Sequence, residues 1–297
     1  MNRILVFGGA GFAGSNFITY VNSVNYGDEV FGTSKTSSDG FETADISLYS
    51  DVQDVILKVK PSHIVNFSGS FSNDYEVDYS VNLLGSKNIL DVVVNNKLFD
   101  IKILLIGSSG EYGVNSTKPI DENCPVAPSS FYTLTKSFQT ELMSFYCRVN
   151  HLNISIVRLS NLIGPHMSEK LFIGKFFKAL ANISQNQEIF VGNESGFRDY
   201  VDIRDAVRGC YGLLKTARSG EVYNLGSGKV TQIKTIIDAA LQSVQVPRSS
   251  IKSENVSSVK KIDFQLMDIE KITKLIGFVP EYSIDDSIKN VLANMKK

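Results

Sequence analysis

Residues 4–14, ILVFGGAGFAG, carry the pattern that decides the fold. The four apolar residues Ile4–Phe7 predict a short buried strand, and the segment Ser15–Val24 after the glycines has helical character. Glycines at this spacing permit a tight turn, let backbone N–H groups approach a pyrophosphate, and let the helix pack closely on the strand. The positive end of the helix dipole lies at the same place. A strand, a glycine turn and a helix in this order therefore predict a dinucleotide-binding site.

Short apolar runs alternate with longer helical segments through the first half of the chain. Runs that are apolar throughout are typical of parallel strands that are buried on both faces. The series therefore predicts an α/β fold with a Rossmann-type, doubly wound parallel sheet. The expected strands are Ile4–Phe7, Val30–Thr33, His63–Phe67, Ile103–Ile106 and Ser155–Leu159, and the expected helices are Ser15–Val24, Asp51–Lys58, Val81–Asn95 and Thr133–Arg148.

The regular alternation ends after Pro165. We therefore expect a dinucleotide-binding domain over residues 1–163 and a smaller C-terminal substrate-binding lobe over 164–297, with segments around 198–226 returning to the first domain. The expected elements of this part are an amphipathic helix over Lys170–Ile183, strands around Glu188–Val191 and Val222–Leu225, and helices over Arg204–Thr216 and Thr231–Ser243.

Composition excludes several classes of protein. The 30 Lys and Arg residues balance 31 Asp and Glu residues, with no block of like charge, so a nucleic-acid partner is not expected. No apolar run approaches the ~18 residues that a membrane helix needs, and the first run is too short for a signal peptide. A soluble, cytoplasmic protein is expected. Cys124, Cys147 and Cys210 lack the spacing of a disulfide framework or a zinc site, so no metal is predicted.

The second expected strand bears on the choice of cofactor. NAD sites usually place a carboxylate at the end of this strand, where it accepts the ribose hydroxyls. Here the strand ends in Ser34-Lys35-Thr36, and a hydroxyl with a cation could hold a 2′-phosphate. The pattern favours NADP over NAD, although Lys35 could also be a solvated loop residue. Asp45 could lie near the adenine amino group or could cap a helix.

A serine, a tyrosine and a lysine form the candidate catalytic set. Ser108 stands at the end of the strand over Ile103–Ile106, and Tyr132 and Lys136 lie four residues apart on one face of an expected helix. An ammonium beside the phenol, together with an oxidised nicotinamide, would lower the tyrosine pKa toward neutrality and make it an acid and base. The serine hydroxyl could then bind the reacting oxygen.

The Tyr-x-x-x-Lys motif alone is weak, because chance gives about one such pair in a chain of this composition. A second copy occurs at Tyr211 and Lys215. It has no serine-bearing strand end before it, so we interpret Tyr211 as a packing residue and Lys215 as solvated. The first copy follows both the serine and a proline-rich loop over Pro119–Pro128.

Taken together, the motifs resemble the extended short-chain dehydrogenase/reductase family that modifies nucleotide sugars. Within it, the chain most resembles the GDP-4-keto-6-deoxy-mannose reductases. The resemblance covers nearly the whole chain. It rests on FGGAGFAG at 7–14, Asp45-Ile46, NFSGS at 66–70, VNLLGSKN around Asn82, IGSSGEYG at 106–113, Tyr132 with Lys136, RLSNLIGP at 158–165, RDYVDIRDAVRG at 198–209, EVYNLGSG at 221–228 and MDIEKITKLIGFVPEYSIDDSI at 267–288.

This resemblance implies an oxidoreductase of deoxysugar biosynthesis. The expected activity is NADP-dependent reduction of a 4-keto, and in particular a 4-keto-6-deoxy, nucleoside-diphosphate sugar. Two alternatives stay open: an NAD-dependent nucleotide-sugar 4-epimerase, and a protein of another class that senses NADP without turnover. The resemblance also implies a homodimer that forms through the helices over Val81–Asn95 and Ser137–Arg148.

The resemblance also assigns roles to residues. Ser108, Tyr132 and Lys136 are catalytic, Asn82 supports the proton relay, and Arg198 grips the substrate pyrophosphate unless it pairs with Asp199 or Asp202. The expected cofactor-binding residues are Gly8, Gly11, Phe12, Ala13, Ser34, Lys35, Asp45, Ile46, Phe67, Ser68, Gly69, Asn82, Tyr132, Lys136 and Leu159, and the expected substrate-binding residues are Ser70, Ser109, Asn161, Val191 and Arg198.

Some positions depart from the family pattern. Gly110 stands where sugar 4,6-dehydratases carry an acidic residue and GDP-fucose synthases a cysteine, which disfavours both activities. Glu111 cannot replace the acid, because adjacent residues on a strand face opposite sides. His166 is interpreted as a loop residue. A second phosphate-binding arginine is missing, and Lys260 or Lys261 could stand in for it.

Overall fold

A computed structural model describes residues 2–24, 26–113, 118–183, 188–253 and 264–295. Within these ranges, seven strands form one parallel sheet in the order β10-β6-β5-β4-β1-β2-β3. This confirms the expected Rossmann-type fold. The strands are β1 (Arg3–Phe7), β2 (Glu29–Ser34), β3 (Phe41–Thr43), β4 (His63–Asn66), β5 (Lys102–Ser108), β6 (Asn153–Leu159) and β10 (Val222–Leu225).

Alternating side chains of the apolar strands build a hydrophobic core on each face of the sheet. In β1, Ile4 and Val6 join the core beneath one helical layer, and Leu5 and Phe7 join the core beneath the other. The first layer holds α1 (Phe12–Val24) and α7 (Ile203–Thr216), with α9 (Glu270–Ile276) against α7; the second holds α2 (Tyr49–Val59), α4 (Gly85–Asn95) and α5 (Phe131–Asn150). Burial on both faces explains why these short strands are apolar throughout.

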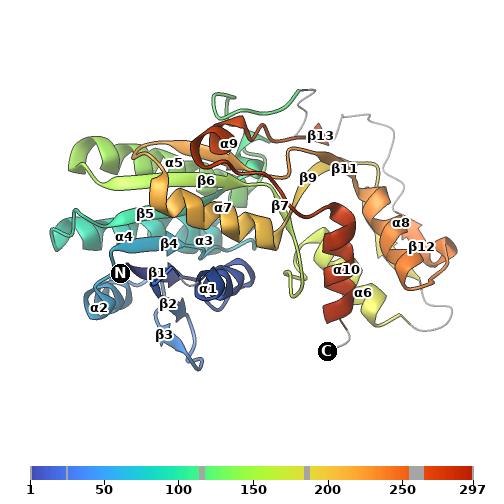
Figure 1. Ribbon diagram of the computed structural model, residues 1–297, viewed down its shortest axis with the longest axis horizontal. Coiled ribbons are helices and arrows are strands. Elements are labelled where there is room, and N and C mark those ends of the chain that lie inside the picture. Colours follow the sequence, from blue (N-terminus) through green and yellow to red (C-terminus); the bar gives the residue numbers. More distant parts are fainter. Residues whose placement is uncertain (1, 25, 114–117, 184–187, 254–263, 296–297) are drawn as a thin grey trace.

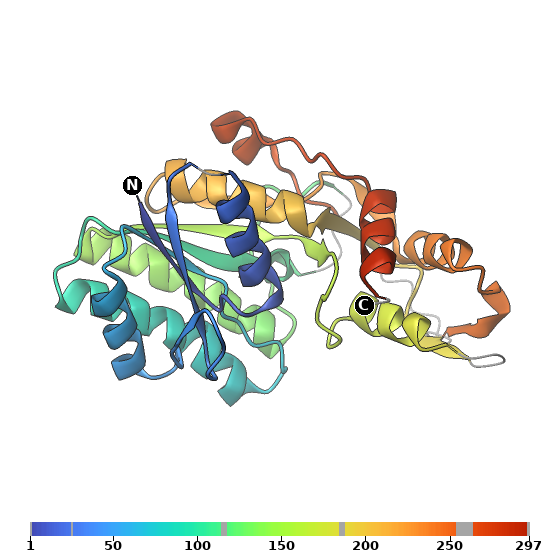
Figure 2. The same ribbon diagram turned by 60° about the horizontal axis from the view of Figure 1, so that its bottom comes forward.

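The later part of the chain builds a second core at one end of the sheet, where α6, α8 and α10 gather (Figure 1). A four-stranded sheet is centred on β9, and β8 pairs with β12. The elements are β7 (Asn161–Ile163), α6 (Phe172–Ala181), β8 (Ile189–Val191), β9 (Phe197–Asp202), β11 (Val230–Gln232), α8 (Ile233–Ser243), η3 (Arg248–Ser250), β12 (Ile251–Ser253), β13 (Phe264–Gln265) and α10 (Ile284–Asn294). Figure 2 shows the two lobes side by side, with the N-terminus at the first and the C-terminus at the second.

Elements from the later half return to the first lobe. Strand β10 pairs with β6 at the edge of the large sheet, α7 packs against α1, and α9 packs against α7. The first lobe is therefore assembled from stretches that are far apart in sequence.

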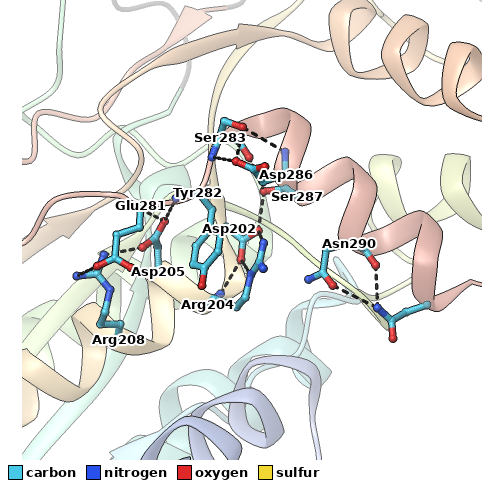
Figure 3. A network of polar contacts seen from close by, with 11 residues as sticks. Asp202, Arg204, Asp205, Arg208, Glu281, Tyr282, Ser283, Asp286, Ser287 and Asn290 are labelled. Atoms are coloured by element: carbon cyan, nitrogen blue, oxygen red, sulfur yellow. Dashed lines mark hydrogen bonds and ion pairs between the residues drawn. The ribbon is translucent and has the colours of Figure 1, made fainter. Parts of the chain in front are cut away.

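A network of buried carboxylates holds the C-terminal segment against the start of α7 (Figure 3). Asp205 accepts hydrogen bonds from the backbone N–H groups of Glu281 (2.9 Å) and Tyr282 (3.0 Å) and pairs with Arg208 (2.6 Å). Asp202 accepts a hydrogen bond from the Ser287 hydroxyl at 2.7 Å. The network thus fixes α10 to the helix that crosses back to the first lobe.

Several boundaries differ from the sequence prediction. Helix α1 begins at Phe12, directly at the glycine turn, and the predicted helix over Val81–Asn95 is split into a π-helix, η1 (Tyr79–Leu84), and α4, after the short α3 (Tyr75–Asp78). Glu111 lies in a 3-10 helix, η2 (Ser109–Tyr112), and not on a strand. Among the described residues, no helix is both long enough and apolar enough to cross a membrane.

Candidate active site

A cavity of about 760 Å³ lies at the carboxyl ends of the sheet strands, between the two lobes. It brings together polar and aromatic side chains that are far apart in sequence. The first lobe contributes Phe12, Ala13, Phe67, Gly69, Ser70, Phe71, Ser108, Ser109, Tyr132, Lys136, Leu159 and Ser160, and the rest of the lining includes Asn161, Lys170, Arg198, Tyr200 and Gln265.

The glycine turn has the close-packed geometry that its sequence predicts. Gly8 has a positive φ of 73°, and a Cβ there would lie 2.7 Å from the backbone nitrogen of Ser68. A Cβ on Gly14 would lie 2.2 Å from the Gly8 carbonyl oxygen. Gly11 donates its N–H to that same oxygen at 3.0 Å. Glycine is therefore required at Gly8, where the turn packs against the loop after β4, and at Gly14, where α1 packs against the turn.

At the end of β2, Lys35 and Asp45 form an ion pair at 2.8 Å. The Asp45 carboxylate also accepts hydrogen bonds from the backbone N–H and the hydroxyl of Ser47, at 3.0 and 2.7 Å. Burial would raise the pKa of Asp45, but hydrogen bonds from Lys35 and Ser47 outweigh it and hold the pKa below its usual range. Lys35 remains 73% exposed along its side chain. The cation expected for a 2′-phosphate is therefore already paired, and Asp45 also stabilises a local turn.

Ser34 and Ile46, which were also predicted to contact the cofactor, make contacts within the protein. Ser34 accepts the Ala44 N–H through its backbone oxygen at 2.9 Å. Ile46 is buried against Gly85, and its carbonyl oxygen accepts a hydrogen bond from Asn88 at 3.0 Å.

Ser108 and Tyr132 meet at the cavity, as the sequence pattern predicts. The Ser108 hydroxyl lies close enough to the Tyr132 phenol to affect its pKa, and it accepts the Gly110 N–H at 3.1 Å. Burial raises the pKa of Tyr132, while the Ser108 hydrogen bond acts in the opposite direction. Phe71 covers the phenol ring edge-on, with ring centroids 4.8 Å apart. The arrangement suits a protonated tyrosine that can donate a proton to a ligand oxygen.

Lys136 lies at the same cavity, but its ammonium is directed differently from the prediction. Its Nζ donates to the Ile106 carbonyl oxygen at 2.7 Å and to Gln139 at 3.3 Å. Burial lowers the pKa of Lys136 to about 8, against the raising effect of the Glu111 carboxylate. In this structure burial of the phenol raises the Tyr132 pKa, and the ammonium is held by the Ile106 carbonyl oxygen. The lowering expected beside an oxidised nicotinamide stays a prediction.

Asn82 ties the loop after β4 to α5. Its amide donates to the Ser70 carbonyl oxygen and to the Thr135 hydroxyl, both at 3.0 Å, and its oxygen accepts the Ser70 N–H at 2.9 Å. A Cβ on Gly69 would lie 3.8 Å from the Lys136 Nζ. Phe67 and Ser68 anchor the start of this loop, through hydrogen bonds from their N–H groups to Phe7 and Asn66. Gly69, Ser70 and Lys136 are thus brought to one wall of the cavity.

The predicted substrate contacts divide into two groups. Ser109, Asn161 and Arg198 line the cavity together with Ser70. Asn161 donates to the Asp199 carbonyl oxygen at 3.0 Å. Val191 does not line the cavity; it is buried in the hydrophobic core of the C-terminal lobe, because β8 turns that side chain inward. As expected, His166 lies exposed in a loop, and Lys260 and Lys261 fall outside the described residues.

The sequence left open whether Arg198 forms an ion pair with Asp199 or Asp202. The Asp199 carboxylate accepts the N–H groups of Ser227 (2.7 Å) and Gly228 (3.1 Å), and Asp202 pairs with Arg204 at 2.8 Å. Both carboxylates therefore have structural partners of their own.

Three features of the site were missed by sequence reasoning. Ser160 lines the cavity, and its buried hydroxyl has no hydrogen-bond partner among the described residues. Gln265 reaches across from β13 and donates to the Ser109 carbonyl oxygen at 2.8 Å. Glu111 and Arg158 form a buried ion pair at 2.8 Å behind the serine. Only the last had a sequence signal, an arginine inside the otherwise apolar end of a buried strand.

Comparison with known proteins agrees with this geometry. Residues 4–226 match the model of a family described as the NAD dependent epimerase/dehydratase family. A putative UDP-glucose 4-epimerase of Methanocaldococcus jannaschii is 28% identical over 99% of this chain and 98% of the relative. A GDP-6-deoxy-D-talose 4-dehydrogenase of Aggregatibacter actinomycetemcomitans is 26% identical, over 99% of this chain and 97% of its own.

Among solved structures, RMD from Pseudomonas aeruginosa complexed with NADPH superposes with a TM-score of 0.88 and 21% identity, over 100% of this chain and 99% of that one. This likeness supports the fold. The family match spans the glycine turn, Ser108, Tyr132 and Lys136. The chain belongs to the NAD dependent epimerase/dehydratase family.

Proposed function

We propose that this protein reduces a 4-keto-6-deoxy nucleoside-diphosphate sugar with NADPH. The observation that carries the proposal is that Ser108, Tyr132 and Lys136 line one cavity, together with Phe12 and Ala13 at the start of α1. A reduced nicotinamide bound there supplies a hydride to the ketone carbon. The named relatives include a 4-dehydrogenase of a deoxysugar nucleotide and a protein in complex with NADPH.

We assign the following roles to the residues of the site. The protonated Tyr132 gives its proton to the sugar oxygen as negative charge develops there, and Ser108 orients that oxygen by a hydrogen bond. Lys136 holds the cofactor ribose with its buried ammonium. Arg198 grips the diphosphate of the substrate from the opposite wall, which a planar guanidinium does better than a point charge.

The cofactor contacts are part of the proposal. The backbone of Gly8 and Gly11, with Phe12 and Ala13 at the start of α1, binds the pyrophosphate. Phe67, Ser68, Gly69, Asn82 and Leu159 form the nicotinamide side, and Ser34, Lys35, Asp45 and Ile46 the adenosine side. NADP requires Lys35 to leave Asp45 for the 2′-phosphate, an exchange that its exposure permits.

The close packing around Gly110 disfavours a dehydratase activity, because it leaves no room for an acidic side chain at this position. A Cβ there would lie 2.7 Å from Thr133 and 3.2 Å from the Ser108 hydroxyl. An acidic side chain at this position would therefore displace the two groups that adjoin Tyr132.

A 4-epimerase is the second candidate, favoured by the name of the relative from Methanocaldococcus jannaschii. An epimerase uses the same three residues but oxidises and then re-reduces the sugar. NAD that copurifies with the protein, together with interconversion of UDP-sugars without added reductant, would favour it over the reductase.

The test is an assay with NADPH and a panel of GDP-, UDP- and dTDP-linked 4-keto-6-deoxy sugars, followed by loss of reduced-nicotinamide absorbance. Tyr132→Phe is expected to lower kcat by about 10²–10⁴-fold with little change in NADPH binding. The matched control is Tyr211→Phe, at the other Tyr-x-x-x-Lys pair, which should retain activity. Full turnover by Tyr132→Phe would refute the proposed chemistry, and NADPH binding without any reductase or epimerase activity would indicate a sensor.

A further inference from the structure

A fully buried carboxylate lies directly behind Ser108. Glu111 is 0% exposed and belongs to η2, the short turn that follows β5. It is not among the residues that line the cavity, so it does not touch a ligand bound there. Its function must therefore be exerted through the residues around it.

Glu111 joins three separate elements. One carboxylate oxygen accepts the backbone N–H of Ser108 at 2.8 Å. The other accepts the Arg158 Nε on β6 at 2.8 Å and the Thr140 hydroxyl on α5 at 3.0 Å. The carboxylate also packs closely against β5, since a Cβ on Gly107 would lie 2.7 Å from its Oε1.

The helix that Thr140 belongs to is the one that carries the catalytic pair. Tyr132, Lys136 and Thr140 are spaced four residues apart, so they lie along one face of α5. Through Thr140, Glu111 attaches this face to the end of β5. Together with the hydrogen bond from Lys136 to the Ile106 carbonyl oxygen, this carboxylate sets how the Ser108 end of β5 lies against the Tyr132 face of α5.

Burial raises the pKa of Glu111, while Arg158 and the hydrogen bonds from Ser108 and Thr140 act in the opposite direction. The Arg158 side chain is itself 5% exposed, and its guanidinium stacks 4.5 Å above the Tyr112 ring. A buried charge is tolerated only where an opposite charge and further hydrogen bonds satisfy it, and Glu111 has both. Such an arrangement fixes geometry more than it adds stability, because desolvation of the two ions offsets their attraction.

We propose that Glu111 is a positioning residue, which sets the Ser108 hydroxyl against the Tyr132 phenol by clamping the end of β5 to α5. The kinetic test of this inference rests on the proposed function, because it needs turnover of a substrate. The structural test needs no substrate. Glu111 takes no part in the transfer of protons to the sugar.

The kinetic test compares Glu111→Gln with wild type. We expect kcat to fall by about 100-fold, the size of effect that a misplacement of about 1 Å produces, while KM for the sugar and the dissociation constant of NADPH change little. Active protein is counted by NADPH-binding stoichiometry, so loss of folded protein is not read as loss of kcat. A folded Glu111→Gln enzyme with wild-type kcat, or with a change only in KM, would overturn the proposal.

Thr140 supplies a second test that leaves the ion pair intact, in case Glu111→Gln does not fold. Thr140→Val removes the hydroxyl with little change of shape and is expected to lower kcat by about tenfold. Thr140→Ser keeps the hydroxyl, and its kcat should be close to that of wild type. Equal kcat values for wild type and Thr140→Val would contradict the clamp.

A crystal structure of Thr140→Val separates this inference from the proposed function. We expect the Ser108 hydroxyl to lie farther from the Tyr132 phenol in the variant than in wild type. If the hydroxyl stays in place, Glu111 does not position it. If wild type turns over none of the sugars, the proposed function fails, and this structural comparison still decides the role of Glu111.

Discussion

Lys136 combines a buried ammonium with a pKa of about 8, so its charge is adjustable in the range where enzymes are assayed. Burial lowers the pKa because the charged form loses its hydration. The protonated form is the one that can donate to a ribose hydroxyl. Affinity for the cofactor should therefore depend on pH in a range where ordinary lysines do not titrate.

We predict that the dissociation constant of NADPH rises as pH increases above 8, by up to about tenfold per pH unit. The charged fraction of Lys136 decreases over this range. In Lys136→Arg the guanidinium stays protonated, so the dissociation constant should be nearly independent of pH between 7 and 9.5, roughly. Fluorescence titration of both proteins measures it. The same pH slope in both would show that another group is responsible.

The sequence predicted which residues form the site better than it predicted where their side chains point. Ser108 and Tyr132 meet because a strand end and a helix start have few possible arrangements in this fold. The direction of the Lys136 ammonium was not predictable, since it depends on the position of the Ile106 carbonyl oxygen in the folded sheet. The environment of the Ser160 hydroxyl, which has no hydrogen-bond partner among the described residues, was not predictable either, because it depends on tertiary packing.

Among the elements, α7 shows how the second Tyr-x-x-x-Lys pair is used. Tyr211 donates to Asp28 at 2.6 Å, and Lys215 pairs with the same carboxylate. Asn2 donates to it at 2.7 Å. Tyr211 is thus a packing residue with a polar anchor, while Lys215 is more buried than the sequence suggested. The cluster joins α7 to the loop before β2.

The Asp28 carboxylate should stabilise the fold in a pH-dependent way. Burial would raise its pKa, but hydrogen bonds from Lys215, Tyr211 and Asn2 lower it from 3.8 to about 2. A lowered folded-state pKa stabilises the protein above 3.8, and this stabilisation is lost as pH falls through 2.

We predict that Asp28→Asn lowers the free energy of unfolding by about 1.5–3 kcal/mol at neutral pH. The difference from wild type should shrink as pH falls from 3.8 toward 2. Urea unfolding over a pH series measures it, and Asp238→Asn, in an exposed pair with Lys234, is the control with little expected effect. A difference that does not vary with pH would contradict the role of the charge.

Across the whole molecule, the lobes are connected by the carboxylate network of Figure 3. Asp205 is fully buried and holds two backbone N–H groups of the segment that leads into α10. The Arg204 guanidinium lies 3.5 Å above the Tyr282 ring in the same segment. The position of α10 therefore depends on groups at the start of α7.

We predict that Asp205→Asn lowers the unfolding free energy by about 1–3 kcal/mol, because a buried acceptor of several hydrogen bonds is weakened. The loss should appear first as faster hydrogen exchange over residues 280–294, while strands β1 and β4 keep their protection. Exchange that increases equally in both lobes would argue against a local connection.

The oligomeric state remains a proposal at this scale. Phe131, Phe138 and Phe145 are exposed at seven-residue intervals along α5, with Val149 beyond them. In α4 the described side chains offer no comparable exposed apolar stripe, so α5 would supply most of the interface. We predict that Phe138→Asp with Phe145→Asp converts a homodimer to a monomer, as measured by sedimentation. A wild-type protein that sediments as a monomer would remove the basis for this expectation.

The sheet order was predictable in outline, since alternating apolar strands and helices allow few parallel arrangements. Beyond residue 163, β10 and α7 join the first lobe, and both lie within the segments around 198–226 that were expected to return to it. The pairing of β10 with β6 in particular could not be read from a local pattern, because the two strands are more than sixty residues apart.

The late arrival of β10 has a consequence for biosynthesis. On the ribosome, β6 is complete long before residues 222–225 emerge, so one edge of the nascent sheet stays open to pairing with other chains. A fragment ending near residue 163 should for this reason aggregate, and a chaperone that shields that edge should improve the yield of the full-length chain.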